Sequence, residues 1–180
     1  MKHVVRVAVV ALIFSSSGAD ARFVVEKVDA QRVDEGIRVR VELDLSLTDA
    51  VEQALSNGVP LIVIHEIALQ RNGWFWHHVE QKVSEKHRLR YYALSGQYVV
   101  DGNESAMDAF RSASDALDMI SSAVTTFDAP ARDAGYTIAV RSRIDINALP
   151  APLRPTALFS PQWQLSSDWS QWPIEGSPTN

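Results

Sequence analysis

The chain of 180 residues contains no cysteine. Without a thiol it forms no disulfide, binds no metal through thiolates and has no cysteine nucleophile. Attachment of haem through Cys-x-x-Cys-His and a lipoprotein anchor are excluded for the same reason. The apolar core alone must therefore hold the fold together.

Runs of positive charge are also missing. Lys and Arg number 17 against 22 Asp and Glu, which leaves a formal net charge of −5. Nucleic acids and anionic lipids select Lys/Arg-rich surfaces, so we expect neither as a partner.

Motifs of catalysis are absent as well. There is no Gly-x-Ser-x-Gly elbow and no Ser-x-x-Lys pair, and the eight glycines are scattered rather than gathered in a phosphate-binding loop. We therefore expect no enzyme activity and no cofactor.

No apolar run approaches the roughly 20 residues of a transmembrane helix. The longest N-terminal run, Val7–Phe14, follows a basic head (Lys2, His3, Arg6) and precedes the small-x-small sequence Ala19-Asp20-Ala21. These features predict a signal peptide over residues 1–21, cleavage after Ala21, a periplasmic location and a mature chain without a transmembrane span.

The clearest structural pattern is strict alternation from Ile37 to Leu47, typical of a strand with one buried face. Phe23–Val33 is its expected partner, connected through Asp34-Glu35-Gly36. Val59–Leu69 is almost continuously apolar and predicts a strand buried on both faces. Further strands are expected at Trp74–Val83 and Tyr136–Ile146, and Arg88–Leu94 with Gln97–Val100 is either a strand pair or one strand with a bulge at Gly96. The expected helices are a short one after Thr48-Asp49 and a main one over Ala106–Ser122 that begins at the capping sequence Ser105-x-x-Asp108.

These elements predict a mainly β fold, with α+β as the alternative. We expect one antiparallel β-sandwich-like domain over residues 22–175, with about seven strands, one main helix and one short helix. Residues 176–180 are expected to be a disordered tail.

Four arginines have the spacing of strand neighbours that share a face. They are Arg88, Arg90, Arg141 and Arg143, with Glu80, Glu85 and Asp145 as candidate cross-strand partners. One interpretation is a solvated face with ladders of opposite charges. The other is a strip that binds anions or carboxylates, because guanidinium groups match them in shape.

Tryptophans form a second candidate set. Trp74 and Trp76 share a face of one expected strand and could bind a sugar, a peptide or a partner surface. Trp163, Trp169 and Trp172 lie in a tail that we expect to be fastened to the sheet by burial of its indoles.

The histidines offer only a weak metal site. His65, His78 and Glu80 have allowed zinc ligand types, but the adjacent His77 and His78 point to opposite faces of a strand. Half-exposed cross-strand histidines are the alternative interpretation.

Several segments resemble a family of exported proteobacterial proteins described as "domain of unknown function 4390". The resemblance rests on residues 49–61, Trp74-Phe75-Trp76, residues 88–94 with 97–99, Leu149–Arg154 and Gln162–Trp169. It implies a signal peptide and an envelope location, and it provides no catalytic residues. Where the family usually has an acidic residue after its tryptophans, this chain has His77-His78.

Together these observations predict a non-catalytic periplasmic module that binds a protein or another envelope component, with a link to envelope sensing. A domain that binds a small sugar or peptide through Trp74 and Trp76 is the alternative. A metal-dependent or other hydrolase is the third hypothesis.

Overall fold

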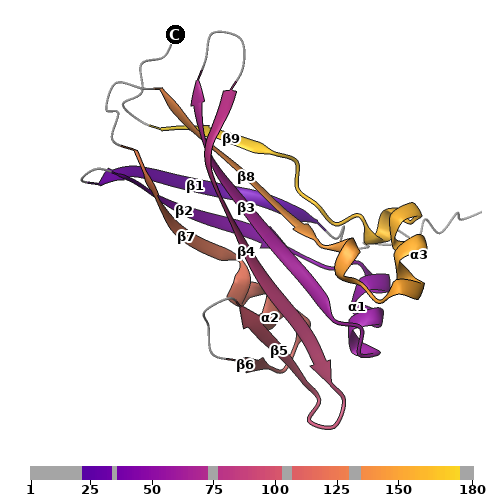
Figure 1. Cartoon of the computed structure of the whole chain (residues 1–180). Coiled ribbons are helices and arrows are strands. Elements are labelled where there is room, and N and C mark those ends of the chain that lie inside the picture. The colour runs from indigo at the N-terminus through magenta and orange to yellow at the C-terminus, as the bar shows by residue number, and fades with distance from the viewer. Residues whose placement is uncertain (1–21, 34–35, 73–76, 103–106, 130–134, 175–180) are drawn as a thin grey trace, which may run out of the picture.

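The computed structural model describes residues 22–33, 36–72, 77–102, 107–129 and 135–174. These residues form two antiparallel sheets that share one apolar core (Figure 1). The expected mainly β, sandwich-like class is confirmed, with nine strands in the described residues where about seven were expected. No helix of this described part is long and apolar enough to cross a membrane.

The smaller sheet has the strand order β1-β2-β7, and the larger has the order β6-β5-β4-β3-β8-β9. Helices α1 and α3 gather at one end of the molecule, and α2 lies beside β5 and β6 (Figure 1). The elements are β1 (Phe23–Val33), β2 (Gly36–Leu45), α1 (Asp49–Ser56), β3 (Leu61–Asn72), β4 (His77–Tyr92), β5 (Gln97–Gly102), β6 (Asp108–Phe110), α2 (Ala113–Ile120), β7 (Ser122–Asp128), β8 (Tyr136–Ile144), α3 (Arg154–Phe159) and β9 (Ser170–Pro173), with single 3₁₀ turns at Ile146–Ala148, Ala151–Leu153 and Pro161–Trp163.

Alternation along β2 builds one wall of the core. Ile37 and Val39 are fully buried, whereas Arg38 and Arg40 between them point to solvent. β2 pairs with β1 in the expected hairpin, and a bulge between Val25 and Lys27 shifts the register on the edge strand.

β3 lies inside the larger sheet between β4 and β8, so both of its edges are hydrogen-bonded. Leu61, Val63 and Ile67 face the shared core and have no exposed surface. On the opposite face Ile64 and Glu66 are 4% and 5% exposed. The prediction of a strand buried on both faces is correct, although one of its buried residues is charged.

β4 corrects one prediction. The two strands expected at Trp74–Val83 and Arg88–Leu94 are a single strand of 16 residues. Alternation continues between them, but its inward positions carry the polar residues Glu85 and His87, opposite His65 and Val63 of β3. The hydrophobic pattern is therefore interrupted at positions through which the strand itself continues.

The main helix is a second correction, since α2 covers only Ala113–Ile120 of the expected Ala106–Ser122. The hydroxyl of Ser112 caps it by accepting a hydrogen bond from the backbone N–H of Asp115 at 3.1 Å. Before this cap, Asp108–Phe110 pairs with β5 as an edge strand, so sheet pairing replaces a first turn of helix.

Five predictions concern residues outside the described part of the chain: the signal peptide at 1–21, the turn residues Asp34 and Glu35, the pair Trp74 and Trp76, the cap at Ser105, and the tail at 176–180.

Candidate functional site

The outward face of the larger sheet collects basic side chains. Register places Glu66 of β3 between Arg141 of β8 and Ser84 of β4. Two residues earlier on β3, Ile64 lies between Arg143 of β8 and Lys86 of β4 in the same way. Because residues opposite one another share a face, these side chains all point away from the core.

Glu66 is the centre of this face. Its Oε1 accepts a hydrogen bond from Lys82 Nζ at 2.5 Å, and its Oε2 accepts from Arg141 Nη2 at 2.5 Å and from Arg143 Nε at 3.2 Å. Only 7% of the Glu66 side chain is exposed, against 29–42% for the three cations. The carboxylate therefore lies beneath a partly open layer of positive charge.

Two opposing effects decide the protonation of Glu66. Burial by itself raises the pKa, but the hydrogen bonds from Lys82, Arg141 and Arg143 outweigh it and lower the pKa from 4.5 to about 2. Glu66 is therefore ionised at neutral pH, and it neutralises one of three adjacent positive charges.

The basic face continues across β4. Asp101 of β5 accepts a hydrogen bond from Arg90 at 2.6 Å and lies 4.0 Å from Arg88. We call this surface the basic face; its cations are Lys82, Lys86, Arg88, Arg90, Arg141 and Arg143, and its acids are Glu66, Asp101 and Asp145. Positive charge is thus in excess on this face of a protein whose net charge is −5.

Trp169, just before β9, lies against the same cluster. The Arg141 guanidinium carbon is 4.7 Å from the centre of its ring and Lys82 Nζ is 5.7 Å away, both within cation–π range. Trp169 is 42% exposed, whereas Trp163 is 8% exposed and belongs to the core. Of these two C-terminal tryptophans, Trp163 therefore packs in the core and Trp169 forms part of the surface.

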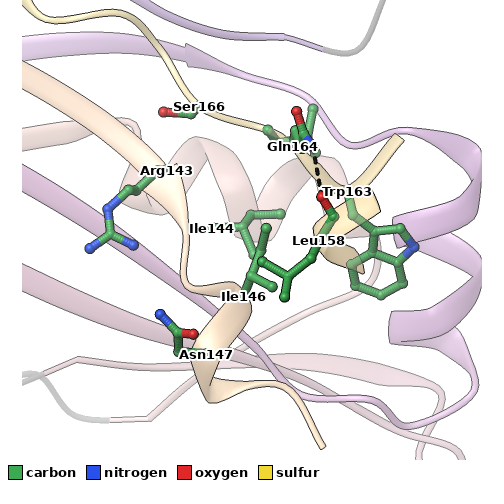
Figure 2. A pocket seen from close by; sticks show the side chains of 9 residues that line it. Arg143, Ile144, Ile146, Asn147, Leu158, Trp163, Gln164 and Ser166 are labelled. Atoms are coloured by element: carbon green, nitrogen blue, oxygen red, sulfur yellow. Dashed lines mark hydrogen bonds between the residues drawn. The ribbon is translucent and has the colours of Figure 1, made fainter. Parts of the chain in front are cut away.

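A pocket adjoins the basic face at the end of β8. Figure 2 shows Ile144, Ile146, Leu158 and Trp163 gathered around it, with the Arg143 guanidinium to one side. Its volume is about 290 Å³. The Gln164 side chain donates a hydrogen bond to the Leu158 carbonyl at 3.0 Å, which ties α3 to the segment before β9 (Figure 2).

A second polar group lies inside the core. His65 Nε2 is 2.9 Å from the Ile120 carbonyl oxygen, and its Nδ1 is 2.9 Å from Ser142 Oγ. Because a carbonyl only accepts, Nε2 carries the proton and Nδ1 accepts from the serine. Burial and the neighbouring His87 lower the pKa of His65 from 6.5 to about 4. Since His65 is fully buried, it acts as a neutral link between β3, β8 and the end of α2.

The candidate zinc ligands do not come together. His78 pairs with Arg71, six residues beyond His65 on β3, which is about 20 Å at the usual rise of a strand. Ligands of one zinc ion lie about 2 Å from it, so His65 and His78 cannot share one. Glu80 instead forms an ion pair with Arg71 at 2.9 Å. Within the described residues no group of three or more His, Asp or Glu side chains is arranged to hold a metal.

The four arginines predicted to share faces, Arg88, Arg90, Arg141 and Arg143, do lie on one face of the sheet. Their main acidic partners, Asp101 and Glu66, are not the acids that the sequence suggested. Of the acids expected to pair with them, only Asp145 approaches one, at 4.0 Å from Arg143. Glu85 lies 3.8 Å from His87 on the inward face.

Sequence reasoning missed Glu66 and Lys82. Glu66 is the one acidic residue in the apolar run Leu61–Leu69. A charge in a strand expected to be buried on both faces requires charged partners, and this signal could have identified it.

Comparison with known protein families gives a match over most of the chain. The family model described as "Domain of unknown function (DUF4390)" matches residues 20–173. Neither a curated protein nor a solved structure matches the chain.

Proposed function

The chain belongs to the DUF4390 family, and we propose that it is an exported, non-catalytic binding module of the cell envelope whose basic face binds an acidic segment of another protein. The observation that carries this proposal is the excess of cations around Glu66 on an otherwise acidic protein. Opposite charge on a partner would steer the encounter and fix its orientation.

Glu66 prepares the basic face for such a partner. It holds Lys82, Arg141 and Arg143 in defined positions while cancelling only one of their charges. Arg143 uses its Nε for Glu66, and its closest other partner among the described residues is Asp145 at 4.0 Å from Nη1. Its two terminal nitrogens can therefore receive a carboxylate in the bidentate geometry that guanidinium groups favour.

Location is the second part of the proposal. The basic head, the short apolar run and Ala19-Asp20-Ala21 support export and removal of residues 1–21. Mass spectrometry of protein purified from the envelope fraction tests this: the expected first residue is Arg22, and a chain that still begins at Met1 would contradict cleavage.

Binding is tested with a fluorescein-labelled peptide of alternating glutamate and serine, measured by fluorescence anisotropy. The double variant Lys86→Glu/Arg88→Glu reverses two exposed charges of the basic face and leaves the Glu66 cluster intact. The matched control, Arg38→Glu/Arg40→Glu, makes the same change in net charge on the outer face of the smaller sheet.

We expect the first variant to weaken binding at least tenfold and the control to weaken it less than threefold. Equal losses in both would show that net charge alone attracts the peptide. That result, or no binding by the unaltered protein, would contradict the proposal.

A further inference from the structure

The pocket beside α3 has the features of a site that receives one apolar side chain, an anchor, from a bound partner. Its walls are mostly apolar, provided by Ile144, Ile146, Leu158 and Trp163 (Figure 2). Ile144 and Trp163 are nearly buried, but Leu158 is 53% exposed. A large apolar side chain is thus left in contact with water at the rim of a concave, mostly apolar space, which is the usual arrangement where a partner inserts a side chain.

Size limits what can enter. Pockets for complete small-molecule ligands begin at roughly 300 Å³, and this one has about 290 Å³ and is open to solvent on one side. A single large side chain such as leucine or phenylalanine fits that space better than a cofactor does. Three polar residues, Asn147, Gln164 and Ser166, also line the pocket and offer hydrogen-bonding groups to the main chain of the segment that carries it.

Arg143 connects the pocket with the basic face. It lines the pocket, and its Nε donates to Glu66 in the cluster with Arg141 and Lys82. Arg141 and Arg143 are two residues apart on β8, about 7 Å, which is also the separation of residues i and i+2 in an extended peptide. A peptide lying along β8 could thus place alternate carboxylates on the two arginines and its next side chain at the pocket.

We propose that the acidic segment bound by the basic face carries a large apolar residue next to its carboxylates, and that this residue is inserted into the pocket between α3 and the end of β8. This inference rests on the proposed function and specifies the partner: an extended acidic segment with one apolar anchor. Charge provides the orientation and burial of the anchor provides most of the specificity.

The experiment compares three fluorescein-labelled peptides by anisotropy. The first alternates glutamate and serine and ends with one extra serine, two residues after the last glutamate and therefore on the glutamate side of an extended chain. The second has leucine in place of that final serine, and the third is the second with glutamine for every glutamate. Two variants accompany them. Leu158→Gln removes an apolar wall at a half-exposed position where folding is not at risk, and Leu94→Gln makes the same change at the fully exposed tip of the β4–β5 hairpin.

We expect the leucine to tighten binding of the acidic peptide at least tenfold. Leu158→Gln should abolish that gain and leave the affinity for the peptide without leucine unchanged, whereas Leu94→Gln should alter neither. Equal affinities with and without leucine would overturn the inference and leave the proposed function standing. Equal affinities of the glutamate and glutamine peptides would overturn it too, and a glutamate–serine peptide that does not bind would overturn the proposed function itself.

Discussion

Arg141 connects Glu66 to Trp169. Its Nε and Nη2 donate to one carboxylate oxygen of Glu66 at 3.0 and 2.5 Å, while its guanidinium carbon lies 4.7 Å from the centre of the Trp169 ring. One planar side chain thus links a buried carboxylate on β3 to a half-exposed aromatic ring 103 positions later in the chain. The relationship holds Arg141 from two sides, so its positive charge has a defined position on the basic face.

The first prediction concerns Glu66. Glu66→Gln removes the carboxylate that Lys82, Arg141 and Arg143 share, and we expect the free energy of unfolding in urea to fall by about 1–2 kcal/mol. The cations keep part of their hydration, which holds the loss below that of a fully buried pair. Glu42→Gln is the control, because Glu42 lies 3.9 Å from Lys27 in an exposed pair and should change stability by less than about 0.5 kcal/mol. A similar small loss in both variants would contradict the central role of Glu66.

The second prediction concerns acid pH. The pKa of His65 is about 4 in the folded protein against 6.5 unfolded, so below pH 6.5 the unfolded chain binds a proton that the folded chain does not. Stability should therefore fall from pH 6.5 to about pH 4, by up to about 3 kcal/mol. Protonation of Glu66, whose pKa is lowered from 4.5 to about 2, extends the loss to lower pH.

Urea unfolding at a series of pH values checks this. His65→Gln should flatten the slope between pH 6.5 and 4, and His78→Gln, which removes an exposed histidine of β4, should leave it unchanged. A slope that survives in His65→Gln would mean that another group takes up the proton.

The third prediction compares two tryptophans. Trp163→Ala removes an 8% exposed ring of the core and should reduce the free energy of unfolding by about 3 kcal/mol or more. Trp169→Ala removes a ring that is 42% exposed and stacks on Arg141, and it should cost about 1 kcal/mol or less. If the two losses are equal, Trp169 is a packing residue and does not form part of an accessible face.

The fourth prediction distinguishes two glycines. A Cβ at Gly36 would lie 2.7 Å from the backbone oxygen of Phe127, so any side chain there must push β2 and β7 apart. A Cβ at Gly96 would have no neighbouring atom within 4 Å, so only the left-handed backbone conformation, φ +65°, limits which residue can replace it. Asparagine tolerates that conformation. Gly96→Asn should therefore shift Tm by only a few degrees, and Gly36→Asn should lower it clearly more; the reverse order would contradict this account.

Local patterns predicted most of the strands. Alternation from Ile37 identified β2 and its buried face, and the apolar run from Leu61 identified β3 as an inner strand. Both could be recognised because the spacing of apolar residues along a strand directly reflects whether one or both of its faces are buried. The pattern failed at Glu85 and His87, where inward positions are polar, and at Asp108–Phe110, where pairing with β5 competed successfully with the helix.

The site depended on the order of strands in the sheet. The sequence alone showed that Arg141 and Arg143 share a face, since residues two apart on a strand must do so. That Glu66 is their partner follows only from β8 lying beside β3, which pairs residues 75 positions apart. The tertiary structure likewise decides how the C-terminal segment folds back over the larger sheet. This segment brings Trp169 to Arg141, and it places Leu158 of α3 in the same pocket as Arg143. Composition described an acidic protein, and folding separated its charges so that one face became basic, because strand order and not residue count decides which charges become neighbours.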